Sequence, residues 1–214
     1  MKMKEHFRKR IYSIETFSAA LEDGLDHARE LRGAARGGRV NRAFAERIML
    51  AVTAVNECRY CSYGHTRAAL ASGLSSGEIQ SILAGDFGAA PPDELLALTF
   101  AQHYAERAGQ PDEAAWDRLV EAYGPETAQD VMAYIRMITM GNLAGNTLDA
   151  FLNRLRLQPT APGSTLFQEA GVILGAPVIL GAVLLKRSAR RLLSPVSRRT
   201  SPVSKTKGFH DAQR

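Results

Sequence analysis

Cysteine is scarce in this chain of 214 residues, which holds two cysteines, one tryptophan and 7% aromatic residues. Both cysteines fall in a single C-x-x-C, and no second Cys or His pair stands at zinc-finger spacing, which disfavours a zinc module. No β-type alternation of apolar and polar residues persists anywhere, and no G-x-G-x-x-G follows a predicted strand. The sequence therefore predicts an all-α protein with no cofactor and no metal.

The N-terminal segment lacks the apolar core of a secretory signal. MKMKEHFRKR is basic, but the residues that follow it form the pattern of an amphipathic helix. Because the cysteines also have a redox-type spacing, we expect a reducing, cytoplasmic setting.

Positive charge is confined to one end of the chain. The net charge of +5 combines +8 from residues 186–214 with −3 from residues 1–185. Aromatic residues do not interleave with these cations and no nucleic-acid-binding motif is visible, so we expect no nucleic-acid partner.

Apolar residues recur at steps of three and four along most of the chain, which predicts successive helices. The expected helices cover 11–33, a hairpin that ends at Gly73, a short helix opened by a capping box of Ser75 and Glu78, 93–108, 111–123 and 126–155. Residues 32–41 are predicted as a linker, because they contain three glycines and show no periodicity.

Four residues near the middle of the chain carry the chemistry. In one straight helix, Glu46 and Cys58 would lie about 18 Å apart, but the apolar pattern loosens near Asn56, where we predict a chain reversal. In the resulting hairpin Glu46 faces His65, and Cys61 lies one turn from His65. Cys58 is then close enough to Cys61 for a disulfide.

This order suits thiol chemistry. Glu46 would orient His65, His65 would move a proton to or from Cys61, and Cys58 would resolve an oxidised Cys61. Three alternatives stay open: a zinc site, two buried structural cysteines, and a non-catalytic redox-responsive scaffold.

The pattern E-x11-C-x2-C-x3-H, here Glu46, Cys58, Cys61 and His65, resembles the alkylhydroperoxidase D-like group of the carboxymuconolactone decarboxylase superfamily over roughly residues 35–155. The resemblance implies an oligomeric, all-helical oxidoreductase that reduces hydroperoxides or exchanges disulfides with a dithiol electron donor. It assigns Cys61 as the attacking thiol, Cys58 as its partner, and Glu46 with His65 as the proton relay. The best-known peroxidase members carry histidine where this chain has Tyr60, a difference that bears on peroxide reduction.

The helix predicted over residues 126–155 contains a run of glycines that needs an explanation. The run GNLAGN at 141–146 places glycines inside a helix, where each costs roughly 1 kcal/mol against alanine. Either the helix packs closely on the hairpin there, or Asn142 or Asn146 reaches the site. His103 is expected to lie away from the site.

The chain is predicted to divide into an N-terminal helix (1–34), the alkylhydroperoxidase D-like domain (35–157), an apolar helix with a basic flank (158–192) and a disordered basic tail (193–214). Residues 170–185 carry no charge over 16 positions, a helix of about 24 Å. This is shorter than the ~30 Å hydrocarbon core of a membrane. We expect residues 170–191 to contact the cytoplasmic face of a membrane, with spanning, burial in an oligomer interface or a loosely ordered apolar tail as alternatives.

Overall fold

The computed structural model describes residues 7–193, with side chains described as far as Arg190. Within these residues the chain is all-α and has no strand, which confirms the predicted fold class. Its helices are α1 (Ile14–Asp26), α2 (Ala28–Gly37), α3 (Arg42–Asn56), α4 (Arg59–Ala71), α5 (Ser76–Leu83), the 3-10 helix η1 (Pro92–Glu94), α6 (Leu95–Glu106), α7 (Glu113–Leu155) and α8 (Leu166–Leu193). The predicted disordered tail lies, from residue 194 on, outside the described residues.

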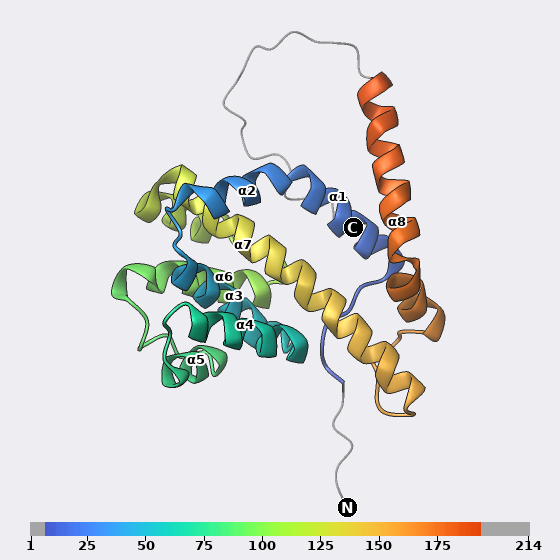
Figure 1. Ribbon diagram of the computed structural model, residues 1–214, viewed down its shortest axis with the longest axis horizontal. Helices are drawn as coiled ribbons and strands as arrows, with labels where there is room; N and C mark the ends of the chain where they lie inside the picture. The colour runs from blue at the N-terminus through green and yellow to red at the C-terminus, as the bar shows by residue number, and fades with distance from the viewer. Residues whose placement is uncertain (1–6, 194–214) are drawn as a thin grey trace, which may run out of the picture.

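Helix α3 is the centre of the main hydrophobic core. Its Ile48, Leu50 and Val52 are fully buried, and it packs against α4, α5, α6 and α7. Figure 1 shows α3 to α6 gathered on one side of the long α7, while α1 and α2 cross its other side and α8 stands at one end. Because α3 is covered by four helices, polar groups on it are held in fixed surroundings.

The predicted single helix over 11–33 is wrong, because the structure has two helices that meet at His27. The His27 backbone N–H donates to the carbonyl of Asp23, and its imidazole Nδ1 lies 2.9 Å from the same oxygen. The two helices also have different partners, since α1 packs on α8 and α2 packs on α7. The linker predicted over residues 32–41 is also shorter than expected, because α2 continues to Gly37.

The capping box predicted before α5 is half formed. The Ser75 hydroxyl accepts a hydrogen bond from the backbone N–H of Glu78. The Glu78 carboxylate does not return the bond but accepts one from Arg47 at 2.6 Å. Arg47 also pairs with the buried Glu94. A tertiary ion pair that joins α3, α5 and η1 thus replaces the local cap.

Helix α7 contains the break predicted between Tyr123 and Pro125. Gly124 has φ 76° and ψ 159°, a non-helical conformation that a side chain rarely adopts. Pro125 then opens the longer part of the helix, where its missing N–H costs nothing. The part of α7 after this break crosses the whole molecule (Figure 1).

Helix α8 is longer than the apolar run that predicted it, with 28 residues. It is anchored at its start by Glu169, which is fully buried and accepts two hydrogen bonds of 2.8 Å from Arg154 of α7. By length and composition it is the one candidate for a membrane helix within residues 7–193. Of its most apolar 18-residue window, 17% is buried inside the protein.

We predict that Gly124→Ala destabilises the fold by about 1–3 kcal/mol, because the backbone there is strained for any residue with a Cβ. No heavy atom lies within 4 Å of the position that this Cβ would take, so a clash would not contribute. Urea unfolding measures the loss. Gly141→Ala, at a helical glycine that also has open space, is the control; equal stability of the two variants would contradict the account.

Candidate active site

The reversal between α3 and α4 is made in very few residues. Glu57 takes a left-handed conformation at φ 55°, which ends α3, and Cys58 is already the N-cap of α4. The preceding Asn56 is buried, and its side chain is held by protein groups. The chain reversal predicted near Asn56 is therefore confirmed.

Glu46 and His65 meet across this hairpin. The Oε2 atom of Glu46 lies 2.8 Å from Nδ1 of His65. The Glu46 side chain is 9% exposed, while that of His65 is 24% exposed. The predicted contact between Glu46 and His65 is confirmed. Glu46 binds the Nδ1 atom of the ring, so the Nε2 atom is the nitrogen that Glu46 does not contact.

The two cysteines lie together at the N-terminus of α4. Their Sγ atoms are 2.6 Å apart, and the Cys58 sulfur also accepts a hydrogen bond of 3.3 Å from the backbone N–H of Cys61. Cys58 is fully buried, whereas Cys61 is partly exposed. Both thiols are free, so the pair can form a disulfide with little movement of the backbone.

The surroundings of the pair favour a single negative charge on Cys58. A hydrogen bond from the Cys61 thiol lowers the pKa of Cys58 to about 6, against burial, which raises it. Backbone N–H groups of Cys61 and Tyr60 and the charge of Lys9 lower this pKa further. The pKa of Cys61 is raised by the same contact with Cys58 and by burial. A hydrogen bond from Asn142 acts in the opposite direction and lowers it. Of the two sulfurs, the surroundings thus favour ionisation of Cys58 over Cys61.

Helix α7 forms the floor of the site at Gly145. A Cβ added there would lie 2.7 Å from the Cys58 sulfur and 3.8 Å from the Cys61 sulfur. Only a hydrogen at this position lets the helix approach so closely. This confirms the close-packing explanation for one glycine of the 141–146 run, whereas Gly141 faces open space.

The polar explanation for the same run also holds, because both asparagines are buried beside the hairpin. Asn142 donates to the Thr53 hydroxyl and accepts from the Asn56 side chain, each at 3.1 Å. Asn146 donates to the backbone carbonyl of Asn56 at 2.8 Å. These hydrogen bonds connect the end of α3 to α7 beside the cysteine pair.

Two basic residues of the N-terminal segment complete this network, and the sequence analysis missed both. Arg10 donates to the Asn56 side chain at 2.7 Å and to the carbonyl of Ala105 at 2.9 Å. Lys9 pairs at 2.9 Å with the buried Asp149 of α7. Neither residue has a spacing relation to the C-x-x-C, so no signal in the sequence could have placed them there.

The outer rim of the site is basic and aromatic. Arg59 lies 2.6 Å from the second oxygen of Asp149 and stacks over the Tyr60 ring, 4.8 Å from its centroid. Tyr60 is 38% exposed. A substrate that reaches Cys61 from this side therefore meets a cation and an aromatic ring.

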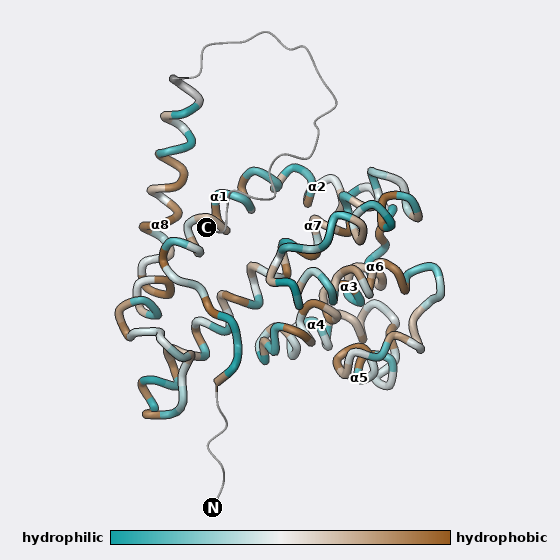
Figure 2. The backbone as a smooth tube through the Cα atoms, turned by 180° about the vertical axis from the view of Figure 1, so that it is seen from behind, coloured by the Kyte–Doolittle hydropathy of each residue, from teal (hydrophilic) through white to brown (hydrophobic). Residues whose placement is uncertain are grey.

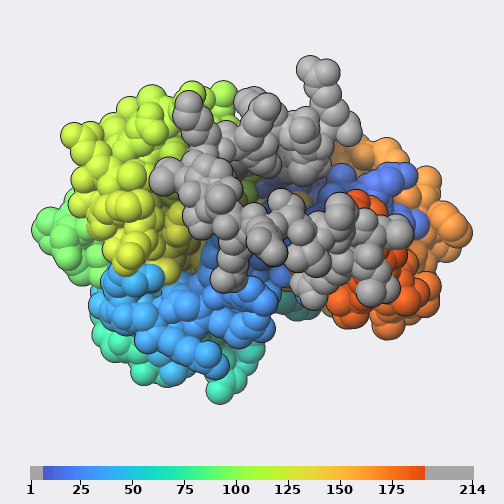
Figure 3. Space-filling model, turned by 90° about the horizontal axis from the view of Figure 1, so that it is seen from above, coloured from blue at the N-terminus to red at the C-terminus, as the bar shows by residue number. Residues whose placement is uncertain are grey.

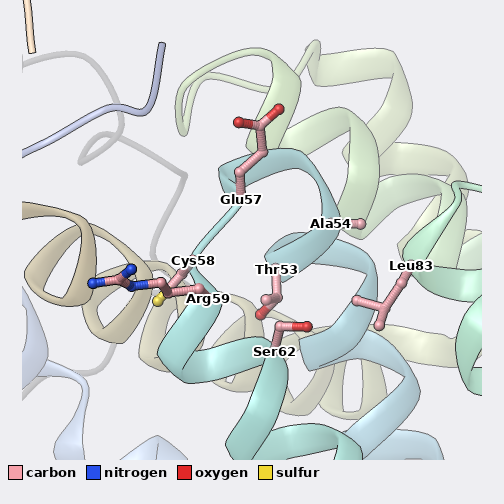
Figure 4. Close-up of a pocket in the computed structure, with 7 residues that line it drawn as sticks. All are labelled: Thr53, Ala54, Glu57, Cys58, Arg59, Ser62 and Leu83. Atoms are coloured by element: carbon pink, nitrogen blue, oxygen red, sulfur yellow. The ribbon is translucent and has the colours of Figure 1, made fainter. Parts of the chain in front are cut away.

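A hollow of about 250 Å³ lies on the other side of the hairpin turn. Figure 4 shows Cys58 and Arg59 at one side of it, Leu83 at the opposite side, and Thr53 with Ser62 between them. The hollow thus borders the site at Cys58 and Arg59, and Cys61 does not line it.

The described residues 7–193 contain no cluster of three or more His, Cys, Asp or Glu side chains placed to hold a metal ion. His103 lies away from the cysteines, as expected, with its Nε2 atom 3.3 Å from the Asp112 carboxylate.

Comparison with protein families supplies the remaining evidence. The model of the carboxymuconolactone decarboxylase family matches residues 22–102, a segment that includes Glu46, Cys58, Cys61 and His65. Residues 22–102 therefore carry a carboxymuconolactone decarboxylase family domain. This confirms the predicted superfamily. Comparisons with curated proteins and with solved structures found no match.

The matched segment does not include the whole candidate site. Asn142, Gly145 and Asn146 follow it, and Lys9 with Arg10 precede it. Residues on both sides of the matched segment thus contribute to the surroundings of the cysteine pair.

We predict that Gly145→Ala destabilises the protein by about 1–3 kcal/mol and slows disulfide formation, because the new methyl group overlaps the Cys58 sulfur. Gly141→Ala is the matched control on the same helix, and there we expect a gain of about 1 kcal/mol from helix propensity. Urea unfolding and thiol counting measure both effects. Equal behaviour of the two variants would show that α7 does not approach the cysteines as described.

We predict that the reduced protein forms one thiolate as pH rises through about 6, seen as thiolate absorbance in the ultraviolet. In Cys61→Ala this transition should move upward toward the ordinary thiol value near 8.5, because the strongest donor to Cys58 is lost. Since the folded pKa of Cys58 is depressed, its contribution to stability is present above the unfolded value and disappears as pH falls through about 6. A wild-type transition only above pH 8 would refute the charge on Cys58.

Proposed function

We propose that the protein is a thiol-dependent oxidoreductase that cycles Cys58 and Cys61 between dithiol and disulfide. The observation that carries this proposal is the 2.6 Å separation of the two sulfurs at the N-terminus of α4. A helix N-terminus stabilises a thiolate, and the thiolate is the reactive form of cysteine. The Glu46–His65 pair on the adjoining helices provides a route for protons.

The accessible sulfur is that of Cys61, so we assign it as the attacking atom, in agreement with the resemblance. His65, which Glu46 orients, accepts the Cys61 proton. The Cys61 thiolate then attacks the terminal oxygen of a hydroperoxide, the O–O bond breaks, and Cys61 becomes a sulfenic acid while an alkoxide leaves. Cys58 next attacks the Cys61 sulfur, the S–O bond breaks, and hydroxide leaves.

The two leaving groups need two protons. One is the proton that Cys61 gave up to His65, and the other comes from solvent through the same imidazole. The products are an alcohol, water and the Cys58–Cys61 disulfide. An external dithiol restores the reduced pair by disulfide exchange. In the exchange form of the reaction, the Cys61 thiolate attacks the disulfide of a protein partner instead of a peroxide.

The redox reading is preferred to decarboxylation because the site is built around a reactive cysteine pair. We place the activity in the cytoplasm, where a dithiol resting state is maintained, and we expect a homo-oligomer without a nucleic-acid partner. The aromatic Tyr60 beside the pair makes a protein disulfide or an organic hydroperoxide a better substrate than hydrogen peroxide, because its ring offers apolar contact.

A single-turnover experiment tests the proposal. Fully reduced protein receives one equivalent of an organic hydroperoxide, and free thiols are counted over time in wild type, Cys58→Ser and Cys61→Ser. We expect rapid loss of both thiols in wild type, and a trapped sulfenic acid only when Cys61 is present. In Glu46→Gln the loss should be slower by roughly 10²–10⁴-fold, the usual contribution of a positioned acid–base pair.

Glu121→Gln, at an exposed position of α7, is the control for removing a carboxylate and should react as wild type does. Thiol loss no faster than that of a free thiol would exclude peroxide reduction. If Glu46→Gln also left the alkylation rate of Cys61 unchanged, the cysteines would belong to a non-catalytic scaffold.

A further inference from the structure

Helix α8 exposes large apolar side chains along one side. Phe167, Leu174, Val178 and Leu185 are 78%, 70%, 75% and 73% exposed. Their spacings of seven, four and seven residues place them on one face of the helix. We call these four residues the outer stripe. It is about 27 Å long, because Phe167 and Leu185 are separated by about 18 steps of 1.5 Å along the helix.

The outer stripe lies at one end of the molecule. Figure 3 shows α8 at the opposite end from the helices coloured green, beside the end of α7 and the N-terminal helix. Figure 2 shows hydrophobic residues recurring along the first turns of α8. From Ala170 to Leu185 the helix has no charged residue, so nothing on this face favours contact with water.

The opposite face of α8 is bound to the protein. Val172 and Val183 are buried, and Ala176 and Ile179 pack in the same apolar cluster as Ile14 of α1. At the far end, Lys186 pairs with Glu22 at 2.6 Å and Arg187 pairs with Asp26.

These contacts extend along most of the helix. To surround α8 with lipid, the protein would have to break the Arg154–Glu169 pair and expose the acidic side chains of α1. Charged groups without partners are costly in a membrane, so the contacts argue against a spanning helix.

Positive charge gathers where the stripe ends. Lys186 and Arg190 are 53% and 62% exposed at their side chains, and both engage the single carboxylate of Glu22. Two acidic side chains thus serve three cations of α8, and residues 186–214 carry +8 in total. An anionic surface complements this arrangement, whereas a second copy of the chain would bring another segment of the same sign.

We propose that the outer stripe lies along the headgroup boundary of an anionic lipid bilayer, with α8 parallel to the surface and its basic end on the lipid phosphates. An apolar face joined to a cationic end is the arrangement of helices that bind at the membrane interface. The inward face of α8 keeps its contacts with α1 and α7. This inference is independent of the chemistry of the cysteines.

Sedimentation with vesicles tests the proposal, using the full chain with phosphatidylcholine alone and with added phosphatidylserine. We expect binding that requires phosphatidylserine, weakens with salt and is released by alkaline carbonate. Leu174→Glu with Val178→Glu should weaken binding at least about tenfold, because each exposed apolar side chain then loses its transfer into the bilayer. Phe167→Glu with Leu185→Glu, at the ends of the stripe, should do the same.

The matched control is Leu155→Glu with Leu157→Glu, which adds the same charge at side chains 60% and 92% exposed near the end of α7. This variant should bind as wild type does, and circular dichroism confirms that each variant is folded. Equal binding by stripe and control variants would overturn the proposal in favour of the basic segment alone. Retention after carbonate would establish a spanning helix. If the protein did not bind vesicles, and formed dimers that the stripe variants dissociated, the outer stripe would instead be a contact with a second copy of the chain.

Discussion

The approach of α7 to the N-terminus of α4 is the constraint on which the rest of the site depends. Gly145 leaves room for the Cys58 sulfur, and no larger residue could do so without a shift. Because the sulfur is held there, the backbone N–H of Cys61 donates to it at 3.3 Å and the Cys61 sulfur lies 2.6 Å from it. The asymmetry of the pair, with one buried sulfur and one accessible sulfur, follows from this packing.

A polar network holds the two helices in this position. The buried Asn56 lies at its centre, since its side chain and carbonyl bind Arg10, Asn142 and Asn146. Buried amides are stable only when their hydrogen bonds are made. The end of α3 can therefore move little relative to α7.

The geometry of the candidate site could be predicted from the sequence because its determinants are local. Glu46 and His65 lie at nearly equal distances from a turn that Asn56 marks, so an antiparallel hairpin brings them together. Arg10 could not be placed in this way, because its partners lie 46 and 95 residues away and no periodicity relates them.

The errors at α1 and α5 have the same cause. His27 ends α1 where two tertiary partners diverge, and Arg47 takes the Glu78 carboxylate that a local cap would have used. Tertiary contacts decided both. The role of each cysteine and the domain boundaries stay predictions.

The most direct test of this account is the redox equilibrium of the pair. Reduced protein is brought to equilibrium in dithiol buffers of graded potential, and the intact mass is measured at each one. We predict a reversible loss of two hydrogens from the monomer, with Cys58 and Cys61 oxidised together and the ratio changing tenfold per ~30 mV, as for a two-electron couple. Oxidation of Cys61 alone, or disulfides only between chains, would contradict the close pairing of the two sulfurs.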